Sequence, residues 1–196
     1  QLQYCSSNRT IYENILRIRP GETLVIKKGK ITRSILHEFV EQKYIIKKKI
    51  TKNYIADALM ESVSAHLRSD VPCCVFFSGG IDSMLVLYFM SLLKLSKISA
   101  YTIRFDKKNV NFDENLKVYA SKFNVDFAEI NFDQNDFWNL LPFAAKNIDE
   151  PIADYAILPT FKLAREASKN FKVVLTGEGG DELFGGYGRY RAIMRT

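Results

Sequence analysis

The feature that most constrains the fold is a short run in which every residue is apolar, Cys73–Phe77. A strand with one face in water alternates apolar and polar residues. This run has no polar face, which is typical of a strand buried on both sides of a parallel sheet. A second apolar run, Val173–Leu175, lies near the other end of the chain. The sequence therefore predicts an α/β fold in which helices cover both faces of a parallel sheet.

Strand and helix patterns alternate through most of the chain. Ile55, Leu59, Val63 and Leu67 recur at helical spacing and predict an amphipathic helix over Lys52–Arg68. Beyond the first buried run, the alternation indicates right-handed βαβ units. It predicts strands at 98–105, 126–130 and 172–176, and helices at 82–93, 113–123, 135–146 and 158–168.

The first quarter of the chain has a different pattern. Thr23–Ile26 and Ile31–Arg33 predict two strands joined by a tight turn, a β-hairpin with no helix around it. The lysine-rich stretch 43–52 is typical of a linker. We therefore expect residues 1–42 to belong to one domain and residues 53–196 to another.

Composition excludes some classes of protein and leaves others open. The longest apolar stretch, Met84–Leu93, is too short to span a bilayer. Residues 1–4 lack the basic head and apolar run of a signal peptide. We therefore expect a soluble, cytoplasmic protein with no membrane partner. The net charge of +6 suits either an RNA partner or attraction for ATP, and it does not decide between them.

A Gly-rich loop, Ser78–Ser83, joins the first buried strand to the next helix. It therefore lies at the carboxyl end of the strand, where open α/β sheets bind ligands. Its two glycines allow close backbone approach, so that N–H groups at the positive end of the helix form an anion cradle. The loop lacks the lysine of a Walker A motif. Asp82 would repel phosphate directly and so implies a bridging Mg²⁺. The alternative is an ordinary turn in which Asp82 and Ser83 cap the helix.

A second Gly-rich turn, Thr176–Glu182, follows the second buried run and holds three carboxylates. Acids packed this closely repel one another unless a cation lies among them. Asp181 is a candidate to complete a Mg²⁺ site with Asp82. Glu178 is a candidate base or a group that polarises a nucleophile. The alternative is a solvated acidic turn.

Two further features point to the same site. Ile103, at the end of the predicted strand 98–105, is placed to contact a flat adenine ring, although an ordinary core position explains it equally well. The segment Asp149–Asp154 combines three acids with a rigid proline in a loop, which suits substrate recognition. A solvated loop is the alternative there.

Together these residues resemble the glutamine-dependent asparagine synthetase family, over nearly the whole chain. The segments that look like the end of its N-terminal glutaminase domain, an Ntn-hydrolase fold, are Arg9–Tyr12, Arg19–Glu22 and Lys28–Lys30. Those that look like its synthetase domain are the Ser78 loop, Asp149–Pro151, and Thr176–Glu182 followed by Phe184–Tyr187.

The resemblance implies an adenine nucleotide alpha hydrolase-like domain of the ATP-pyrophosphatase type, whose loop is also called a PP-loop. It implies ATP and Mg²⁺, with a glutaminase domain of the same full-length chain as partner. The implied ATP and pyrophosphate ligands are Phe76, Ser78, Gly79, Gly80, Asp82, Ser83, Ile103 and Gly177. The implied Mg²⁺ ligands are Asp82 and Asp181, and Glu178 is the implied catalytic residue. The acids that we assign to the substrate side are Asp149, Glu150 and Asp154.

In that family, a substrate carboxylate attacks the α-phosphorus of ATP, and ammonia then displaces AMP from the acyl-adenylate. Aspartate is the default substrate, with a sugar acid or another small acid as alternatives. A tRNA-modifying ATP-pyrophosphatase and a non-catalytic nucleotide-binding module are the competing functions. The family's glutaminase nucleophile is an N-terminal Cys, whereas this chain starts with Gln1. The family's downstream lysine also has no counterpart. We therefore expect a fragment that hydrolyses no glutamine by itself.

Overall fold

The computed structural model describes residues 5, 7–37, 50–93, 97–105, 110–150, 154–188 and 190. The chain divides into two compact units. The first comprises residues 1–50 and 143–155, and the second comprises residues 51–142 and 156–196. The predicted linker at 43–52 lies mostly outside the described residues, so the predicted domain boundaries stay a prediction. Within the described part of the chain, no helix is both long and apolar enough to cross a bilayer.

The first unit contains the predicted hairpin, with strands β1 (Glu22–Lys27) and β2 (Lys30–Leu36) paired antiparallel. Its turn residues Lys28 and Gly29 both have positive φ, 49° and 74°. Such a two-residue turn matches the right-handed twist of the two strands, and glycine adopts it without strain. The hairpin is therefore confirmed, and its strands extend a few residues beyond the predicted ones.

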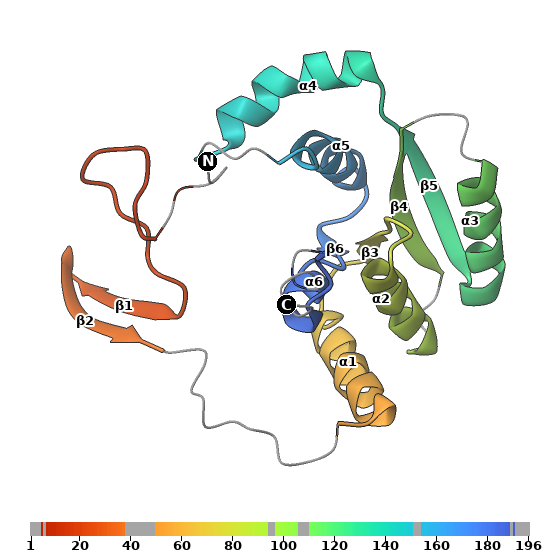
Figure 1. Ribbon diagram of the computed structural model, residues 1–196, viewed down its shortest axis with the longest axis horizontal. Coiled ribbons are helices and arrows are strands. Elements are labelled where there is room, and N and C mark those ends of the chain that lie inside the picture. Colours follow the sequence, from red (N-terminus) through yellow and green to blue (C-terminus); the bar gives the residue numbers. More distant parts are fainter. Residues whose placement is uncertain are drawn as a thin grey trace. The chain divides into compact units, whose positions relative to one another are not determined.

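The second unit is built on a four-stranded sheet in which every neighbouring pair is parallel (Figure 1). Its strands are β3 (Cys73–Phe76), β4 (Ile98–Arg104), β5 (Val125–Asn131) and β6 (Val173–Leu175). Cys74 and Val75 are fully buried, as expected for a strand with both faces covered. Burial also raises the pKa of the Cys74 thiol to about 11, so this thiol is un-ionised at neutral pH.

Helices cover both faces of this sheet, which confirms the predicted fold class. On one face, residues from three helices share a core with Val75 and Phe77. On the other face, Ala167 packs against Cys74 and Tyr101. The helices on the first face are α1 (Lys52–His66), α2 (Ile81–Leu92) and α3 (Val110–Phe123). The helix on the second face is α5 (Ile157–Ala167); the remaining helices are α4 (Gln134–Asn147) and α6 (Gly180–Phe184).

The strand order is β5–β4–β3–β6. The chain therefore runs outward from β3 to β4 and β5, and then returns to place β6 on the opposite side of β3. In open α/β sheets, the crevice for ligands lies at the carboxyl ends of the strands where the order reverses. That point is between β3 and β6, which are the strands that precede the two Gly-rich turns. The sequence predicted the strands but not their order.

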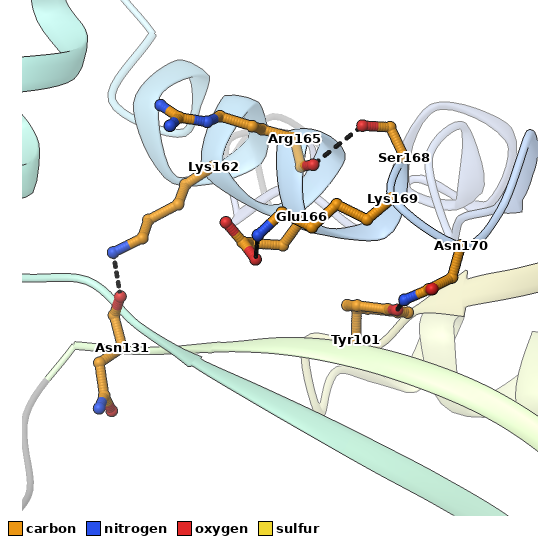
Figure 2. Close-up of polar contacts among 8 residues, drawn as sticks. All are labelled: Tyr101, Asn131, Lys162, Arg165, Glu166, Ser168, Lys169 and Asn170. Carbon is orange, nitrogen blue, oxygen red and sulfur yellow. Dashed lines mark hydrogen bonds and ion pairs between the residues drawn. The ribbon is translucent and has the colours of Figure 1, made fainter.

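Polar contacts hold α5 onto the sheet (Figure 2). Lys162 Nζ donates to the carbonyl of Asn131 at the end of β5, at 2.6 Å, and pairs with Asp136 Oδ2 at 2.5 Å. Asn170 Nδ2 donates to the hydroxyl of Tyr101, at 3.4 Å. Asp136 also belongs to the start of α4, where its backbone N–H donates to Asp133 Oδ1 at 2.8 Å. Lys162 therefore joins β5, the first turn of α4 and α5.

We expect Asp136→Asn to lower the melting temperature at pH 7. The hydrogen bond from Lys162 is the main reason why the pKa of Asp136 lies below its usual value. The loss of one charge-assisted bond costs about 1 kcal/mol, which is about 2–4 °C for a domain of this size. Because the folded pKa is lowered, the contribution is present above the unfolded pKa, about 4, and is lost as pH falls through the folded pKa.

The measurement is the melting temperature of wild type and variant between pH 7 and about pH 2. The control is Asp126→Asn, which removes an exposed ion pair with Lys97 and should shift the melting temperature little. A gap between wild type and Asp136→Asn that stays constant down to pH 2 would contradict this assignment.

Candidate phosphate-binding site at the carboxyl edge of the sheet

The Ser78 loop continues directly from β3. Phe77 N donates to the carbonyl of Tyr101 on β4, at 2.9 Å, so the loop starts from a fixed strand end. Gly79 has φ of 80°, a conformation in which a side chain would be strained. Gly80 is the N-cap of α2 and supplies no side-chain cap. The alternative in which Asp82 and Ser83 cap this helix is therefore wrong. Gly80 N donates to Ser78 Oγ at 3.3 Å, and no side chain caps the helix, so the N–H groups of residues 81–83 suit an anion.

The two serine hydroxyls hold this loop in shape. Ser83 Oγ donates to the carbonyl of Gly80 at 3.1 Å and lies 3.1 Å from Ser78 Oγ. It also accepts from Ser78 N at 3.3 Å. Ser83 is only 4% exposed, whereas Ser78 is exposed. The hydroxyl of Ser83 therefore shapes the loop from inside, and the hydroxyl of Ser78 lies on its solvent side.

The second Gly-rich turn lies against the Ser78 loop. A Cβ added at Gly180 would lie 2.5 Å from Cγ of Asp82. A Cβ added at Gly177 would lie 2.6 Å from the backbone nitrogen of Ser83. A side chain at Gly177 would collide with this backbone, and one at Gly180 would displace the Asp82 side chain, so glycine at both positions lets the two turns approach. The strand order thus brings together two Gly-rich motifs that lie far apart in the sequence.

The acids of the second turn have different surroundings. Asp181 directly follows Gly180 and is partly buried, and its carboxylate lies against Gly186, where a Cβ would meet it. Glu178 is exposed. Glu182 accepts a hydrogen bond of 2.6 Å from the hydroxyl of Tyr187. Asp181 is therefore the acid of this turn that is adjacent in sequence to Gly180, which contacts Asp82.

A cavity of about 420 Å³ adjoins this contact. Asp82 and Glu178 lie in its wall together with the glycines of the second turn. Most of the other wall residues are apolar side chains from α1, α2, β6 and α6, for example Leu59, Val63, Phe89 and Leu183. The predicted site residues Asp82, Gly177 and Glu178 therefore line one cavity, and Asp82 and Glu178 bring carboxylates to a mostly apolar wall.

His66 on α1 lines the same cavity, with its Nδ1 2.8 Å from the carbonyl of Ser62. Its position depends on how α1 packs beside α2 and β6. The helical periodicity predicted which face of α1 is apolar but not which elements pack against it. The sequence therefore did not predict that His66 lines the cavity.

Two predicted nucleotide contacts come from neighbouring strands. Phe76 ends β3 and packs beside the buried Cys74 and Tyr101 on the α5 side of the sheet. Ile103 is partly buried on β4, two positions beyond Tyr101, which pairs with Phe76. Neither belongs to the wall of the 420 Å³ cavity.

The candidates on the substrate side lie in the other unit. Asp149, Glu150 and Asp154 belong to the first unit, whereas the Ser78 loop belongs to the second. Asp149 and Asp154 are exposed, and Glu150 forms an ion pair with Arg17.

The acids of the two turns are candidate ligands for Mg²⁺. Among the described residues, no three His, Cys, Asp or Glu side chains come together as a metal site. Mg²⁺ is commonly held by one or two carboxylates together with substrate phosphates and waters. Asp82, and Asp181 in the turn that contacts it, match that pattern beside a loop suited to phosphate. The residues present therefore fit Mg²⁺ that arrives with a nucleotide.

A parallel α/β sheet with a Ser-Gly-Gly-Ile-Asp-Ser loop at its switch point defines an α/β domain with a candidate phosphate site. The chain belongs to the family described as Asparagine synthase, which matches residues 54–196. It is 34% identical over 191 residues to "Putative asparagine synthetase 2 (glutamine-hydrolyzing)" of Methanocaldococcus jannaschii, covering 95% of this chain and 36% of the relative. It is 30% identical over 191 residues to a glutamine-hydrolysing asparagine synthetase of Bacillus subtilis, covering 96% of this chain and 30% of the relative.

Among solved structures, the fold is similar to that of an NH3-dependent NAD synthetase from Campylobacter jejuni. The TM-score is 0.48 at 18% identity, over 71% of this chain and 62% of that chain. The chain spans about a third of the length of the two asparagine synthetase relatives, 36% and 30%. Membership in this family supports ATP-dependent amidation in general.

Proposed function

We propose that this chain forms the nucleotide-binding part of an ATP-dependent carbon–nitrogen ligase that adenylates a small carboxylic acid and amidates it. The observation that carries the proposal is the contact of Gly177 and Gly180 with Ser83 and Asp82. It sets the acidic turn directly against the phosphate loop, so that nucleotide and carboxylates can share one site. Membership in the Asparagine synthase family favours aspartate as the default acid.

The proposed roles follow from the positions of the residues. The backbone of Ser78–Ser83 and the start of α2 hold the pyrophosphate portion of ATP. Phe76, Ile103 and Gly177 line the nucleotide. Asp82 and Asp181 hold Mg²⁺, which when bound neutralises phosphate charge. Glu178 lies in the cavity wall, where it orients ammonia or the intermediate and accepts a proton.

The proposed reaction has two steps. A carboxylate oxygen of the acid attacks the α-phosphorus of ATP, forming an acyl-adenylate and releasing pyrophosphate. Ammonia then attacks the acyl carbon, loses a proton to a base and displaces AMP. The protein supplies mainly positioning and charge neutralisation, because the leaving groups are already good ones.

We also propose that residues 1–42 are the end of a glutaminase domain in the full-length protein, which would supply the ammonia. The paired strands β1 and β2 lie within these residues. The names of the two relatives, both glutamine-hydrolysing, support this assignment. A cytoplasmic location belongs to the same proposal, because ATP and amino acids are available there.

The test is exchange of labelled pyrophosphate into ATP by the full-length protein, with Mg²⁺ and one candidate acid at a time. We expect exchange that depends on aspartate. Exchange that depends instead on another small acid would keep the ligase and change its substrate. Exchange that requires tRNA would replace the proposal with a tRNA-modifying ATP-pyrophosphatase. ATP binding without any exchange would indicate a nucleotide-binding module.

A further inference from the structure

The cavity beside the second Gly-rich turn has buried and exposed apolar residues in one wall. Val63 on α1, Phe89 on α2 and Leu175 on β6 line it and are only 7%, 4% and 8% exposed. Leu183 and Phe184 of the short helix α6 also line it, yet they are 81% and 60% exposed. All of the wall residues belong to the second unit. This unit therefore has an apolar cavity that continues into an exposed apolar rim.

Contacts made by other residues hold helix α6 in place. Gly186 N donates to the carbonyl of Asp181 at 3.0 Å. The hydroxyl of Tyr187 donates to Glu182 Oε1 at 2.6 Å. The ring of Tyr187 also meets that of Tyr190 edge-on, with 5.6 Å between the centroids. The chain that follows α6 thus folds back onto the acidic residues of the helix, while its apolar pair stays largely exposed within the described part of the chain.

The exposure of this pair indicates the size of an occupant that would cover it. A small molecule in the 420 Å³ cavity would contact only those parts of Leu183 and Phe184 that face the cavity. Most of the surface of both side chains is exposed to water, which is unfavourable for contiguous apolar groups. An occupant that buries both the cavity wall and the rim must extend over α6. An amphipathic helix that lays its apolar face into a groove meets this requirement.

Chain length indicates where such a helix would come from. The chain spans only 36% and 30% of the two asparagine synthetase relatives, so a full-length protein of that size has further chain to place. Because the residues up to Tyr190 fold back onto α6, any chain beyond residue 196 starts close to the cavity. A tethered segment acts at a millimolar effective concentration, which favours it over a second copy or an unrelated protein.

We propose that the cavity, together with Leu183 and Phe184, is the docking surface for a segment that follows residue 196 in the full-length protein. This segment lays an apolar helix face against α1, α2, β6 and α6. The turn Gly177–Gly180 lines the same cavity, so the docked segment also contacts and restrains the acidic turn. The inference goes beyond the proposed function, because it requires no particular reaction or substrate.

The test replaces Phe184 in the full-length protein with the photoreactive amino acid benzoylphenylalanine, which keeps an aromatic ring. Cells that express this protein are irradiated, and peptide mass spectrometry identifies what lies against α6. We expect a crosslink within one chain, to a peptide that follows residue 196. The control carries the same amino acid in place of Val118, an exposed residue of α3 outside the cavity wall, and should not crosslink to that peptide.

The other crosslinking results would each overturn the inference. A crosslink between two copies would make the surface an interface of a homo-oligomer. A crosslink to a peptide of a different protein would make it a site for a separate partner. No crosslink, or one only to residues 1–196, would leave the surface without the proposed occupant.

Thermal unfolding gives a second reading that also needs no activity. A residue as exposed as Leu183 tolerates a polar substitution, unless something absent from the described surface buries it. We therefore expect Leu183→Asp to lower the melting temperature of the full-length protein by about 5–10 °C. Val118→Asp should lower it by less than about 2 °C. If Leu183→Asp yields no folded protein, Leu183→Ser and Val118→Ser give the same comparison. Equal melting temperatures for the paired variants would contradict a docked segment.

Discussion

Gly180→Ala should lower acid-dependent exchange of pyrophosphate into ATP by about 100-fold or more, while the protein stays folded. The added Cβ would lie 2.5 Å from Cγ and 2.7 Å from Oδ1 of Asp82. These atoms are the end of a side chain, so Asp82 can escape by rotating away. The escape removes its carboxylate from the position beside the second turn. The effect should therefore be on Mg²⁺ and nucleotide chemistry rather than on stability.

Two other glycines make this prediction specific. At Gly177, a Cβ would meet the backbone nitrogen of Ser83 at 2.6 Å, and a backbone cannot rotate away. Gly177→Ala should therefore lower both the melting temperature and the exchange rate. At Gly188, a Cβ would meet nothing within 4 Å, so Gly188→Ala should behave like wild type. Wild-type exchange in Gly180→Ala would show that the carboxylate of Asp82 need not lie beside this turn.

The second large effect is expected from Asp82 itself. Asp82→Ala and Asp82→Asn should both reduce Mg²⁺-dependent ATP turnover in the full-length protein below about one hundredth of wild type. Alanine removes the side chain, whereas asparagine keeps its shape and removes the charge. If the carboxylate binds Mg²⁺, the two variants should be similarly inactive. Turnover and Mg²⁺ dependence would be measured with saturating ATP.

The control for Asp82 is Asp126→Asn, an acid of the same unit whose ion pair with Lys97 is exposed. This variant should keep wild-type turnover. If Asp82→Asn keeps its turnover, Asp82 is not a metal ligand, and the site has to be rebuilt around Asp181 and Glu178. If turnover returns only at high Mg²⁺, Asp82 remains a ligand but contributes affinity rather than an essential charge.

Local chemistry made much of this fold predictable. The apolar run that starts at Cys73 predicted the buried strand, and the periodicity from Ile55 to Leu67 predicted α1. Glycines indicate backbone positions where a side chain would be strained or would clash, and they identified both Gly-rich turns of the candidate site. The hairpin followed from two β-rich runs around a turn. Each of these signals lies within a few residues of the element that it specifies.

The remaining features depend on pairing between distant segments. The residues Val173–Leu175 do not indicate whether their strand lies beside β3 or beyond β5, because any strand buried on both faces has the same apolar pattern. The cavity position of His66 follows from that pairing and from the packing of α1. Likewise, the sequence around Glu150 does not indicate that Arg17 is its partner, because a single acid in a loop has the same sequence pattern whether it is solvated or ion-paired.

The strand order also has a consequence for synthesis on the ribosome. Strands β3, β4 and β5 emerge in order, and each can pair with its predecessor, since these contacts are comparatively local. The Ser78 loop is made with the first of them, yet the turn that lies against Asp82 follows β6, about a hundred residues later. A nascent chain should therefore hold a largely formed sheet with an incomplete candidate phosphate site until residues 173–181 leave the exit tunnel. Nucleotide binding would then mark completion of this unit rather than its beginning.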